Sequence, residues 1–355
     1  MASARFLLVS YQPFRLLFRL LYCGVIALQL PYFVLRAAVP SLRPHATWSA
    51  KQTFMMRLAY RILDLLPSAS SFYKGLLTST TTKPATIGGT WYPRAPGEDI
   101  ASKPVFLYFH GGAFIQGDGR DANCGLIAKK LLDKGSADAI FSVQYRLSGY
   151  GGLNPFPAAL QDALSSYLFL LNDLHVPASQ IVVAGDSAGG NLTIALLLYL
   201  HNFGAATGVS TPKCAVLLSP WVAPFHYHMD DNPHRGTDFV PASYSSWGAD
   251  NYAGSWPNAR SDPYITQLGN PFPTPVPIFA NAGSAEMFYE RILQWADEMR
   301  GVEGNVVEVH HEEAAPHDTF LSAELLGFEK SAWEVAAKIG EFVAKHSVHD
   351  SCNYQ

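Results

Sequence analysis

A serine enclosed by glycines is the residue of this chain whose setting points most directly to chemistry. Residues 185–190 read Gly-Asp-Ser-Ala-Gly-Gly, which places Ser187 in a G-x-S-x-G pattern. An apolar run at 181–184 precedes the pattern, and a helical pattern at 188–202 follows it. A sharp turn from strand to helix accepts only small neighbours, exposes the serine hydroxyl and places it near the positive end of the helix. The sequence therefore predicts a nucleophile at Ser187.

A second glycine-rich stretch supplies candidate donors for a negatively charged oxygen. Residues 110–114 read His-Gly-Gly-Ala-Phe and directly follow an apolar run at 105–109. Glycines let backbone N–H groups approach a substrate closely, so we expect Gly111, Gly112 and, after the serine, Ala188 to form an oxyanion hole. A simple β-turn at 110–114 is the alternative interpretation.

The serine needs a base, because a hydroxyl is a poor nucleophile until a neighbouring group takes its proton. The sequence has 12 histidines. His317 is preferred because it follows an apolar run at 306–309 and completes the order serine, acid, histidine that this arrangement requires. His310 and His311 lie closer to that run and are the alternatives, with packing or contact with solvent as their expected role.

The acid that orients the base should follow the preceding strand of the same sheet. An apolar run at 276–280 leads directly toward Glu286, and Glu290 stands one helical turn later. We expect Glu286 to be the acid and Glu290 to be its rival. A carboxylate in the first turn of a helix is also favoured by the helix dipole alone.

These residues must be positioned by the elements between them, and short apolar runs alternate with helical patterns over most of the chain. The alternation predicts an α/β fold with a mainly parallel sheet. Chemistry in such sheets lies beyond the carboxyl ends of the strands, where the candidate residues stand. We expect strands at 86–92, 105–109, 139–145, 181–184, 215–218, 276–280 and 306–309, and helices at 121–134, 157–174, 188–202, 285–300 and 327–345.

Two further segments are expected to cover the site. The alternation stops over about 222–273, and an excursion of this length is too long for a plain loop, so it should form a lid or cap. An amphipathic period at 53–66 predicts a helix. We assign it, with the rest of residues 41–80, to the cap. Residues 81–355 then form the catalytic domain.

The amino-terminal segment carries an apolar run of bilayer length. Residues 16–35 are almost wholly apolar and are flanked by Arg15 and Arg36, and about 20 such residues cross a bilayer. A cleaved signal peptide would need a small-x-small site after the run, where Arg36 and Pro40 stand. We therefore expect residues 1–40 to be a retained anchor and the protein to be associated with membranes of the endoplasmic reticulum.

Composition excludes several classes of protein. Of the 355 residues, 48% are hydrophobic and 15% charged, which indicates a folded chain rather than a disordered one. A net charge of −4, with no block of Lys and Arg, argues against nucleic acid as a partner. The 4 cysteines form neither a disulfide framework nor a C-x-x-C pair. Histidines and aspartates gather at 226–234, where a solvated loop is favoured over a metal site.

Together these motifs resemble the hormone-sensitive-lipase branch of the α/β-hydrolases over about residues 85–345. The resemblance rests on motifs in the family's order, beginning at residues 110, 145, 156, 185 and 219 and ending with Glu286 and His317. It implies hydrolysis of carboxylic esters without a cofactor, beneath a cap built from amino-terminal helices and an insertion. The leader and residues 48–51 also look like those of fungal steryl acetyl hydrolase relatives.

The expected function is hydrolysis of hydrophobic carboxylic esters, such as an acetylated sterol, lipid or secondary metabolite. Phe114 and Trp221 offer aromatic surface near the expected pocket, so we expect them to contact the substrate. An amidase or formamidase with the same triad is the alternative among enzymes. A receptor that keeps the fold without catalysis is the alternative outside them, although a receptor does not need serine, histidine and acid together.

Overall fold

A computed structural model describes residues 13–70, 85–148, 153–226 and 232–346 of the chain. Its centre is a seven-stranded sheet in the order β1-β3-β2-β4-β5-β6-β7, in which β1 pairs antiparallel with β3 and all the other pairs are parallel. The predicted α/β fold with a mainly parallel sheet is confirmed. The strands are β1 (Gly89–Tyr92), β2 (Val105–Phe109), β3 (Ala139–Val143), β4 (Ile181–Asp186), β5 (Cys214–Leu218), β6 (Ile278–Gly283) and β7 (Val307–Glu312).

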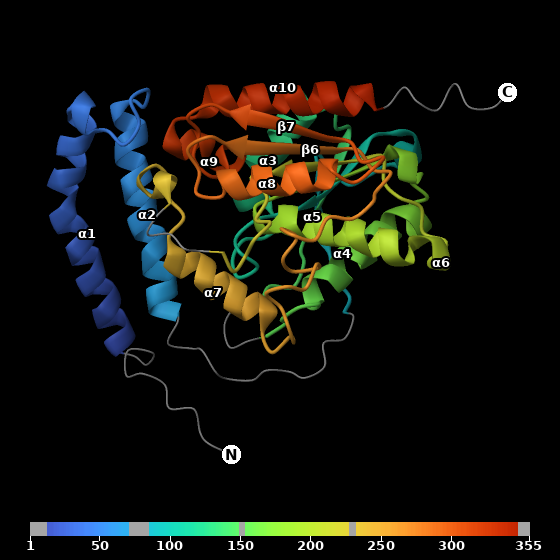
Figure 1. Cartoon of the computed structure of the whole chain (residues 1–355), viewed down its shortest axis with the longest axis horizontal. Helices are drawn as coiled ribbons and strands as arrows, with labels where there is room; N and C mark the ends of the chain where they lie inside the picture. The colour runs from blue at the N-terminus through green and yellow to red at the C-terminus, as the bar shows by residue number, and fades with distance from the viewer. Residues whose placement is uncertain (1–12, 71–84, 149–152, 227–231, 347–355) are drawn as a thin grey trace, which may run out of the picture.

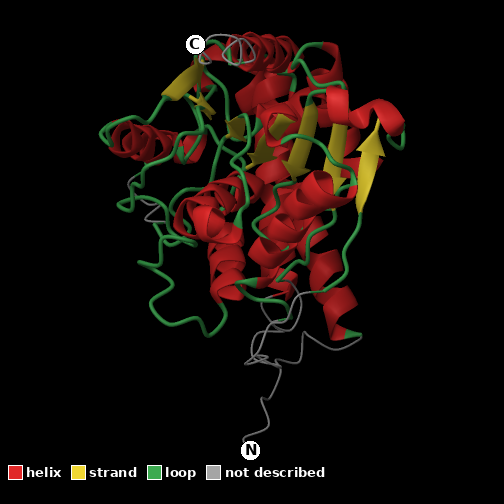
Figure 2. Ribbon diagram, turned by 90° about the vertical axis from the view of Figure 1, so that its right-hand side faces the viewer, coloured by secondary structure: helices red, strands yellow, loops and turns green. Residues whose placement is uncertain are grey.

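Helices cover both faces of the sheet because the central strands are apolar on both sides (Figure 2). In β2, Leu107 packs with the first face and Tyr108 with the second, and both are buried. Continuous apolar runs of this kind are typical of parallel strands that lie inside a protein. The first face carries α4 (Ala158–Leu168), α5 (Ala188–Tyr199) and α8 (Tyr289–Arg300), and the second carries α3 (Asp121–Asp133), α9 (Thr319–Leu326) and α10 (Glu329–Lys345).

Four helices differ from their predicted bounds. The helix expected from residue 285 begins at Tyr289, because residues 283–289 form turns in which the N–H of Glu286 donates to the carbonyl of Gly283. The helix expected at 327–345 is α10 alone, since Gly327 with φ 90° ends the unpredicted α9 before it. The helices predicted at 157–174 and 188–202 end in π-helical turns, and the second is followed by the short α6 (Ala205–Thr207).

Two helices from distant parts of the sequence lie together at the carboxyl edge of the sheet. They are α2 (Ala50–Ser70), which contains the predicted helix at 53–66, and α7 (Ala242–Ala253), which lies inside the insertion at 222–273. No amphipathic period marks α7, because its side chains are buried on several faces of the helix, including Tyr244, Trp247 and Tyr252. The insertion therefore contains a packed helix as well as irregular chain.

The amino-terminal helix α1 (Phe14–Ala38) lies on the outer side of α2, which separates it from the catalytic domain (Figure 1). Phe33 and Ala37 are buried, whereas Leu21 and Leu28, on the opposite side, are exposed. By length and composition, Leu16–Ala38 is long and apolar enough to cross a membrane, and 6% of its most apolar stretch is buried. One side of α1 therefore packs on the protein, and the other presents leucines outward.

Candidate active site

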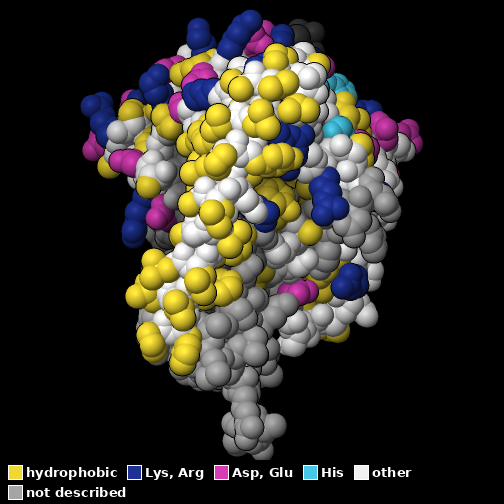
Figure 3. Space-filling view, turned by 90° about the vertical axis from the view of Figure 1, so that its left-hand side faces the viewer, with side chains coloured by type: hydrophobic (Ala, Val, Ile, Leu, Met, Phe, Trp, Pro, Cys, Tyr) yellow, Lys and Arg dark blue, Asp and Glu magenta, His cyan; other side chains and the backbone are white. Residues whose placement is uncertain are grey.

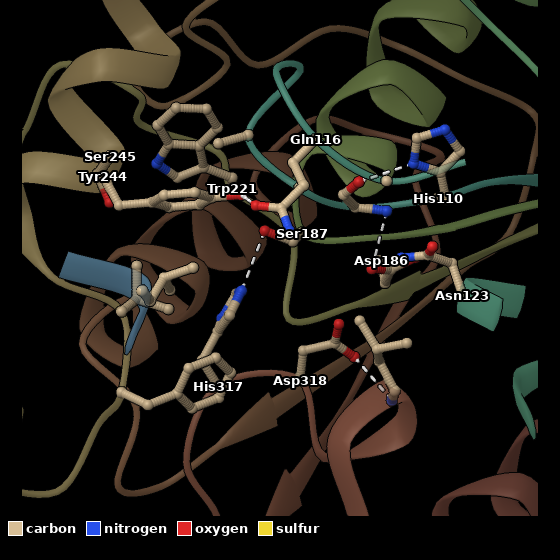
Figure 4. A pocket seen from close by; sticks show the side chains of 18 of the residues that line it. His110, Gln116, Asn123, Asp186, Ser187, Trp221, Tyr244, Ser245, His317 and Asp318 are labelled. Carbon is tan, nitrogen blue, oxygen red and sulfur yellow. Dashed lines mark hydrogen bonds between the residues drawn. The ribbon is translucent and has the colours of Figure 1, made fainter. Parts of the chain in front are cut away.

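Ser187 stands at a strained turn between β4 and α5. Its backbone has φ 49° and ψ −112°, a conformation that only close packing can hold for a residue with a side chain. A Cβ on Gly185 would collide with the backbone of Gly189, and one on Gly189 would collide with the carbonyl oxygen of Phe109. The two flanking glycines are therefore required by the close approach of β2, and the turn exposes the Ser187 hydroxyl to the pocket (Figure 4).

The structure brings the three predicted catalytic side chains together. His317 Nε2 lies 3.0 Å from Ser187 Oγ, and His317 Nδ1 lies 2.8 Å from Glu286 Oε2. The rival acid Glu290 is instead 54% exposed and pairs with His234, with 2.9 Å between Oε1 and Nε2. Serine, base and acid therefore form one continuous chain of hydrogen bonds.

The two other candidate bases have different contacts. His311 Nδ1 lies 2.9 Å from the hydroxyl of Tyr289, and His310 stacks on Phe279. Neither contact involves Ser187. The ring contact of His310 with Phe279 corresponds to the packing role that was expected for these histidines.

Buried charge makes the base stronger than an ordinary histidine. Burial by itself lowers the pKa of His317, but the hydrogen bond and charge of Glu286, followed by the charges of Asp238 and Asp186, outweigh it and raise that pKa. Glu286 is fully buried, and this burial raises its pKa against the opposing hydrogen bond with His317. An imidazole that readily takes up a proton, held by a carboxylate, suits a general base.

Sequence reasoning missed a second buried carboxylate beside the base. Asp238 accepts hydrogen bonds from the backbone N–H groups of Phe239 at 2.7 Å, Met287 at 2.7 Å and His317 at 3.3 Å. It therefore joins the insertion to the loop that carries Glu286 and to the loop that carries His317. No local motif marks Asp238, because its partners are distant in sequence.

The predicted oxyanion hole needs one correction. The N–H of Gly111 donates to Asp186 Oδ2 at 2.9 Å, so it is not available to a substrate. The N–H groups of Gly112, Ala113 and Ala188 have no acceptor among the described residues. Gly112 and Ala113 have φ of 105° and 53°, a backbone conformation that residues with a side chain rarely adopt. The structure thus replaces Gly111 by Ala113 as candidate donor.

Asp186 holds the loop that contains Gly111, Gly112 and Ala113 in place. Besides Gly111, it accepts the hydroxyl of Tyr108 on Oδ1 at 2.5 Å. Burial, followed by the charge of Asp186 and a hydrogen bond with it, raises the pKa of Asp318 well above its usual range. Asp186 thus has three partners, in two parts of the chain, and fixes the position of the loop.

The pocket in front of Ser187 has a volume of 160 Å³. The predicted contact Trp221 lines it, but Phe114 does not: its ring is fully buried and stacks on Tyr252, with 3.6 Å between the ring centroids. Phe114 is therefore a core residue, and the expectation that it binds substrate is wrong. Residues that the sequence did not single out line the apolar side instead, namely Leu63, Phe239, Val240, Tyr244, Phe288 and Leu321.

The histidine and aspartate cluster at 226–234 forms no metal group in the described part of the chain. Residues 227–231, with His228, Asp230 and Asp231, lie outside the described residues. Among those that the structure describes, no three His, Cys, Asp or Glu side chains are placed to hold an ion.

Behind the nucleophile, Asn191 joins α5 to the insertion. Its side-chain amide donates to the carbonyls of Trp221 and Ile265, both at 2.9 Å, and to Gln267 Oε1 at 2.7 Å. Asn191 is fully buried. The helix that carries Ser187 is thereby tied to the base of the cap.

Comparisons with known proteins identify the same fold. A family model described as the alpha/beta hydrolase fold matches residues 106–321. The chain is 36% identical over 118 residues to esterase LipI of Mycobacterium tuberculosis, covering 32% of this chain and 34% of the relative. It is 35% identical over 117 residues to an acetyl-hydrolase of Streptomyces hygroscopicus, covering 33% and 36%. The chain thus spans about a third of the length of these curated relatives.

Other matches lie in the branch that the motifs predicted. The chain is 30% identical over 138 residues to hormone-sensitive lipase of Homo sapiens, covering 38% of this chain and 12% of the relative. A hormone-sensitive lipase from a metagenome library has a crystal structure with a TM-score of 0.61 and 24% identity, covering 82% of this chain and 97% of that one. The structural likeness concerns the fold.

Proposed function

We propose that this chain, which belongs to the α/β-hydrolase fold family, is a serine hydrolase that cleaves carboxylic esters through an acyl-enzyme. The observation that carries the proposal is the unbroken series of hydrogen bonds from Ser187 through His317 to Glu286. Esterases and an acetyl-hydrolase among the relatives support the same reaction class.

In this mechanism, Ser187 Oγ attacks the ester carbonyl as His317 Nε2 takes its proton. Glu286 holds the imidazole in place and stabilises the imidazolium that forms. The N–H groups of Gly112, Ala113 and Ala188 face the oxygen that becomes negative, and each donor of this kind contributes on the order of 3 kcal/mol to the transition state. His317 then returns the proton to the leaving alcohol, and water hydrolyses the acyl-enzyme by the same route.

The pocket favours a short acyl group on a hydrophobic alcohol. An engineered cavity of about 150 Å³ holds a benzene molecule, and the 160 Å³ here must also accommodate the reacting ester group. An acetyl group fits inside such a volume, whereas a long acyl chain would extend beyond it. Leu63 and Leu321 at the apolar side suit a hydrophobic alcohol, for which an acetylated sterol, lipid or secondary metabolite are the proposed classes.

The proposed site of action is a membrane, reached through α1. Hydrophobic side chains form a continuous band on the face of the molecule where α1 lies (Figure 3). Leu28 is 83% exposed, and Leu20 and Leu21 are exposed nearby. Exposed apolar surface of this extent needs a partner, and a lipid bilayer is the one that suits a long apolar helix. A retained amino-terminal segment of this kind makes the endoplasmic reticulum the proposed compartment.

A matched set of substrates tests the reaction class. The purified protein is assayed on aryl acetates, steryl acetates and longer acyl esters of the same alcohols, and on the amide that matches the best ester. We expect acetyl esters to be turned over fastest. Faster turnover of the amide would indicate an amidase. Absence of turnover together with absence of labelling by a fluorophosphonate would indicate a receptor.

A further inference from the structure

A second cavity, separate from the active site, lies between the two amino-terminal helices. It has a volume of 650 Å³ and is lined by α1, α2 and the loop at Arg235 and Gly236. Four arginines from these three segments face it, and the described residues that line it include no carboxylate. Basic side chains lie beside the hydrophobic band of α1 on this face of the molecule (Figure 3). The arginines are Arg36, Arg57, Arg61 and Arg235.

Among the residues that the structure describes, Arg36 and Arg57 are held in place by neutral groups alone. Arg36 donates to the carbonyl of Leu42 at 3.0 Å and to the hydroxyl of Tyr32 at 3.3 Å. Arg57 donates one Nη to the carbonyl of Gly236 at 3.0 Å. Its Nε is buried without a hydrogen-bond partner in the described structure. Two oriented guanidinium groups therefore have donors to spare and no counter-charge among the described residues.

The electrostatics of Arg57 agree with this arrangement. Burial, followed by the charge of Arg36, lowers the pKa of Arg57, and Arg61 acts in the same direction. A guanidinium nevertheless stays protonated in proteins at neutral pH. An anion in the cavity would offset the repulsion between these charges and would give Arg57 Nε an acceptor.

We propose that this cavity binds a phosphate group. The planar guanidinium presents its N–H donors in a fork that matches the oxygens of phosphate, and clusters of arginine recognise phosphate for this reason. The rim also fits a lipid headgroup, because Leu28 and Tyr32 stand there with 83% and 55% exposure, and tyrosine is enriched at the level of headgroups. Assignment of the source to a lipid rests on the proposed membrane contact of α1, whereas phosphate binding itself does not.

Thermal unfolding of the full-length protein in a nonionic detergent tests the cavity without a membrane. The probes are inorganic phosphate and dihexanoyl-phosphatidic acid, each titrated at constant ionic strength. A saturable rise in the unfolding temperature with the lipid alone supports a headgroup site, and an equal rise with inorganic phosphate supports a site for free phosphate. Absence of a saturable rise with both probes overturns the proposal.

A matched pair of variants separates the cavity from general charge. Arg36→Gln with Arg57→Gln should abolish the rise, whereas Arg94→Gln with Arg291→Gln removes equal charge from exposed positions outside the cavity and should leave it intact. An equal loss in both double variants overturns the proposal. Should the first variant fail to fold, Arg36→Lys with Arg57→Lys keeps the charge and removes the forks, and an apparent Kd as tight as that of the parent overturns the proposal.

Flotation with vesicles then identifies the membrane contribution. Binding to phosphatidylcholine vesicles measures the contact of α1, and added phosphatidic acid measures the cavity. Each arginine contributes about 1 kcal/mol to binding of an anionic lipid surface. The ratio of the affinity for vesicles with phosphatidic acid to the affinity for neutral vesicles should therefore fall on the order of 30-fold when both arginines are replaced by glutamine. An unchanged ratio overturns the headgroup assignment. Failure of the parent to bind neutral vesicles counts against the proposed membrane contact and leaves the thermal shifts to decide the cavity.

Discussion

The carboxyl edge of the sheet and the pair of helices α1 and α2 treat charge in opposite ways. At the edge, the carboxylates of Glu286 and Asp238 are buried, and every one of their oxygens accepts a hydrogen bond from N–H groups of the protein. Between the helices, Arg36 and Arg57 face a cavity without a carboxylate among the described residues, and leucines of α1 are exposed.

The difference separates a region that is complete within the chain from one that needs something outside it. Burying an ion without partners costs several kcal/mol, so the satisfied carboxylates indicate an arrangement finished by folding. The exposed leucines and crowded arginines are the features for which we propose a membrane and a phosphate group as partners. Changes at the sheet edge should therefore affect every substrate, and changes in α1 should affect only substrates that reside in lipid.

The largest effect should come from Ser187→Ala. Removing the hydroxyl should lower turnover on the order of 10⁶-fold, leaving a residual rate from the oxyanion donors. Turnover of a soluble aryl acetate measures this loss. The control Ser245→Ala alters another serine that lines the pocket and should still be labelled by a fluorophosphonate. Labelling that persists in Ser187→Ala would place the nucleophile elsewhere.

A smaller loss should separate the two candidate acids. Glu286→Gln should reduce turnover by up to about 10⁴-fold, because the imidazole loses the carboxylate that orients it and balances its charge. Glu290→Gln removes an exposed partner of His234 and should have little effect. Steady-state kinetics of both variants test the assignment. The opposite ranking would move the acid one helical turn along the chain.

Asp238→Asn should have a moderate effect that depends on pH. His317 must be neutral to act as a base, so kcat/KM falls as the pH drops through its pKa. Asp238 raises that pKa. The variant should therefore shift the acidic limb to lower pH and reduce turnover about tenfold, the equivalent of one charge-assisted hydrogen bond.

The pH profiles of parent and variant are compared with that of Asp162→Asn. Asp162 is also a buried aspartate, but it pairs with Arg146 and is not among the residues that line the pocket. An acidic limb that moves equally in both variants would show general destabilisation rather than a role of Asp238 at the base.

The smallest effect on a soluble ester should come from removing residues 1–37. Every triad and oxyanion residue lies beyond residue 100, so turnover of a small soluble ester should persist. Turnover of an ester embedded in a bilayer should fall, because the truncated protein loses its local concentration at the lipid. Fractionation of membranes and assays on both substrates measure the outcome. Aggregation, or loss of activity on the soluble ester, would make α1 part of the folded core.

The strands of the fold were predictable because a strand that is buried on both faces appears in the sequence as a continuous apolar run. All residues of β2 and β3 are apolar or buried, and such runs need no tertiary context to be recognised. Helix α7 was not predictable, since a helix buried on several faces has no amphipathic period. The start of α8 was also missed, because the turn around Glu286 depends on a contact with Gly283 that only the folded chain makes.

Within the site, a residue was predictable when the groups that identify it lie close to it in sequence or follow the order of the elements. Ser187 was recognised from neighbours within three residues, and His317 and Glu286 from the order of elements. Asp238 acts through backbone groups 49 and 79 residues away, and no local pattern encodes that contact. The choice between Gly111 and Ala113 as oxyanion donor depends on where the Asp186 carboxylate points, which a motif does not specify.

The burial of Asn191 bears on how this chain matures in a cell. Asn191 and Thr193 form the only N-x-S/T acceptor sequence, and the fold leaves no space for a glycan there. If the catalytic domain enters the secretory lumen, transfer of an oligosaccharide to Asn191 competes with folding of the nucleophile helix. Molecules that fold slowly would then be glycosylated at Asn191 before the helix packs, and they would not reach the native state. A glycosidase-sensitive mobility shift in the active fraction would contradict this.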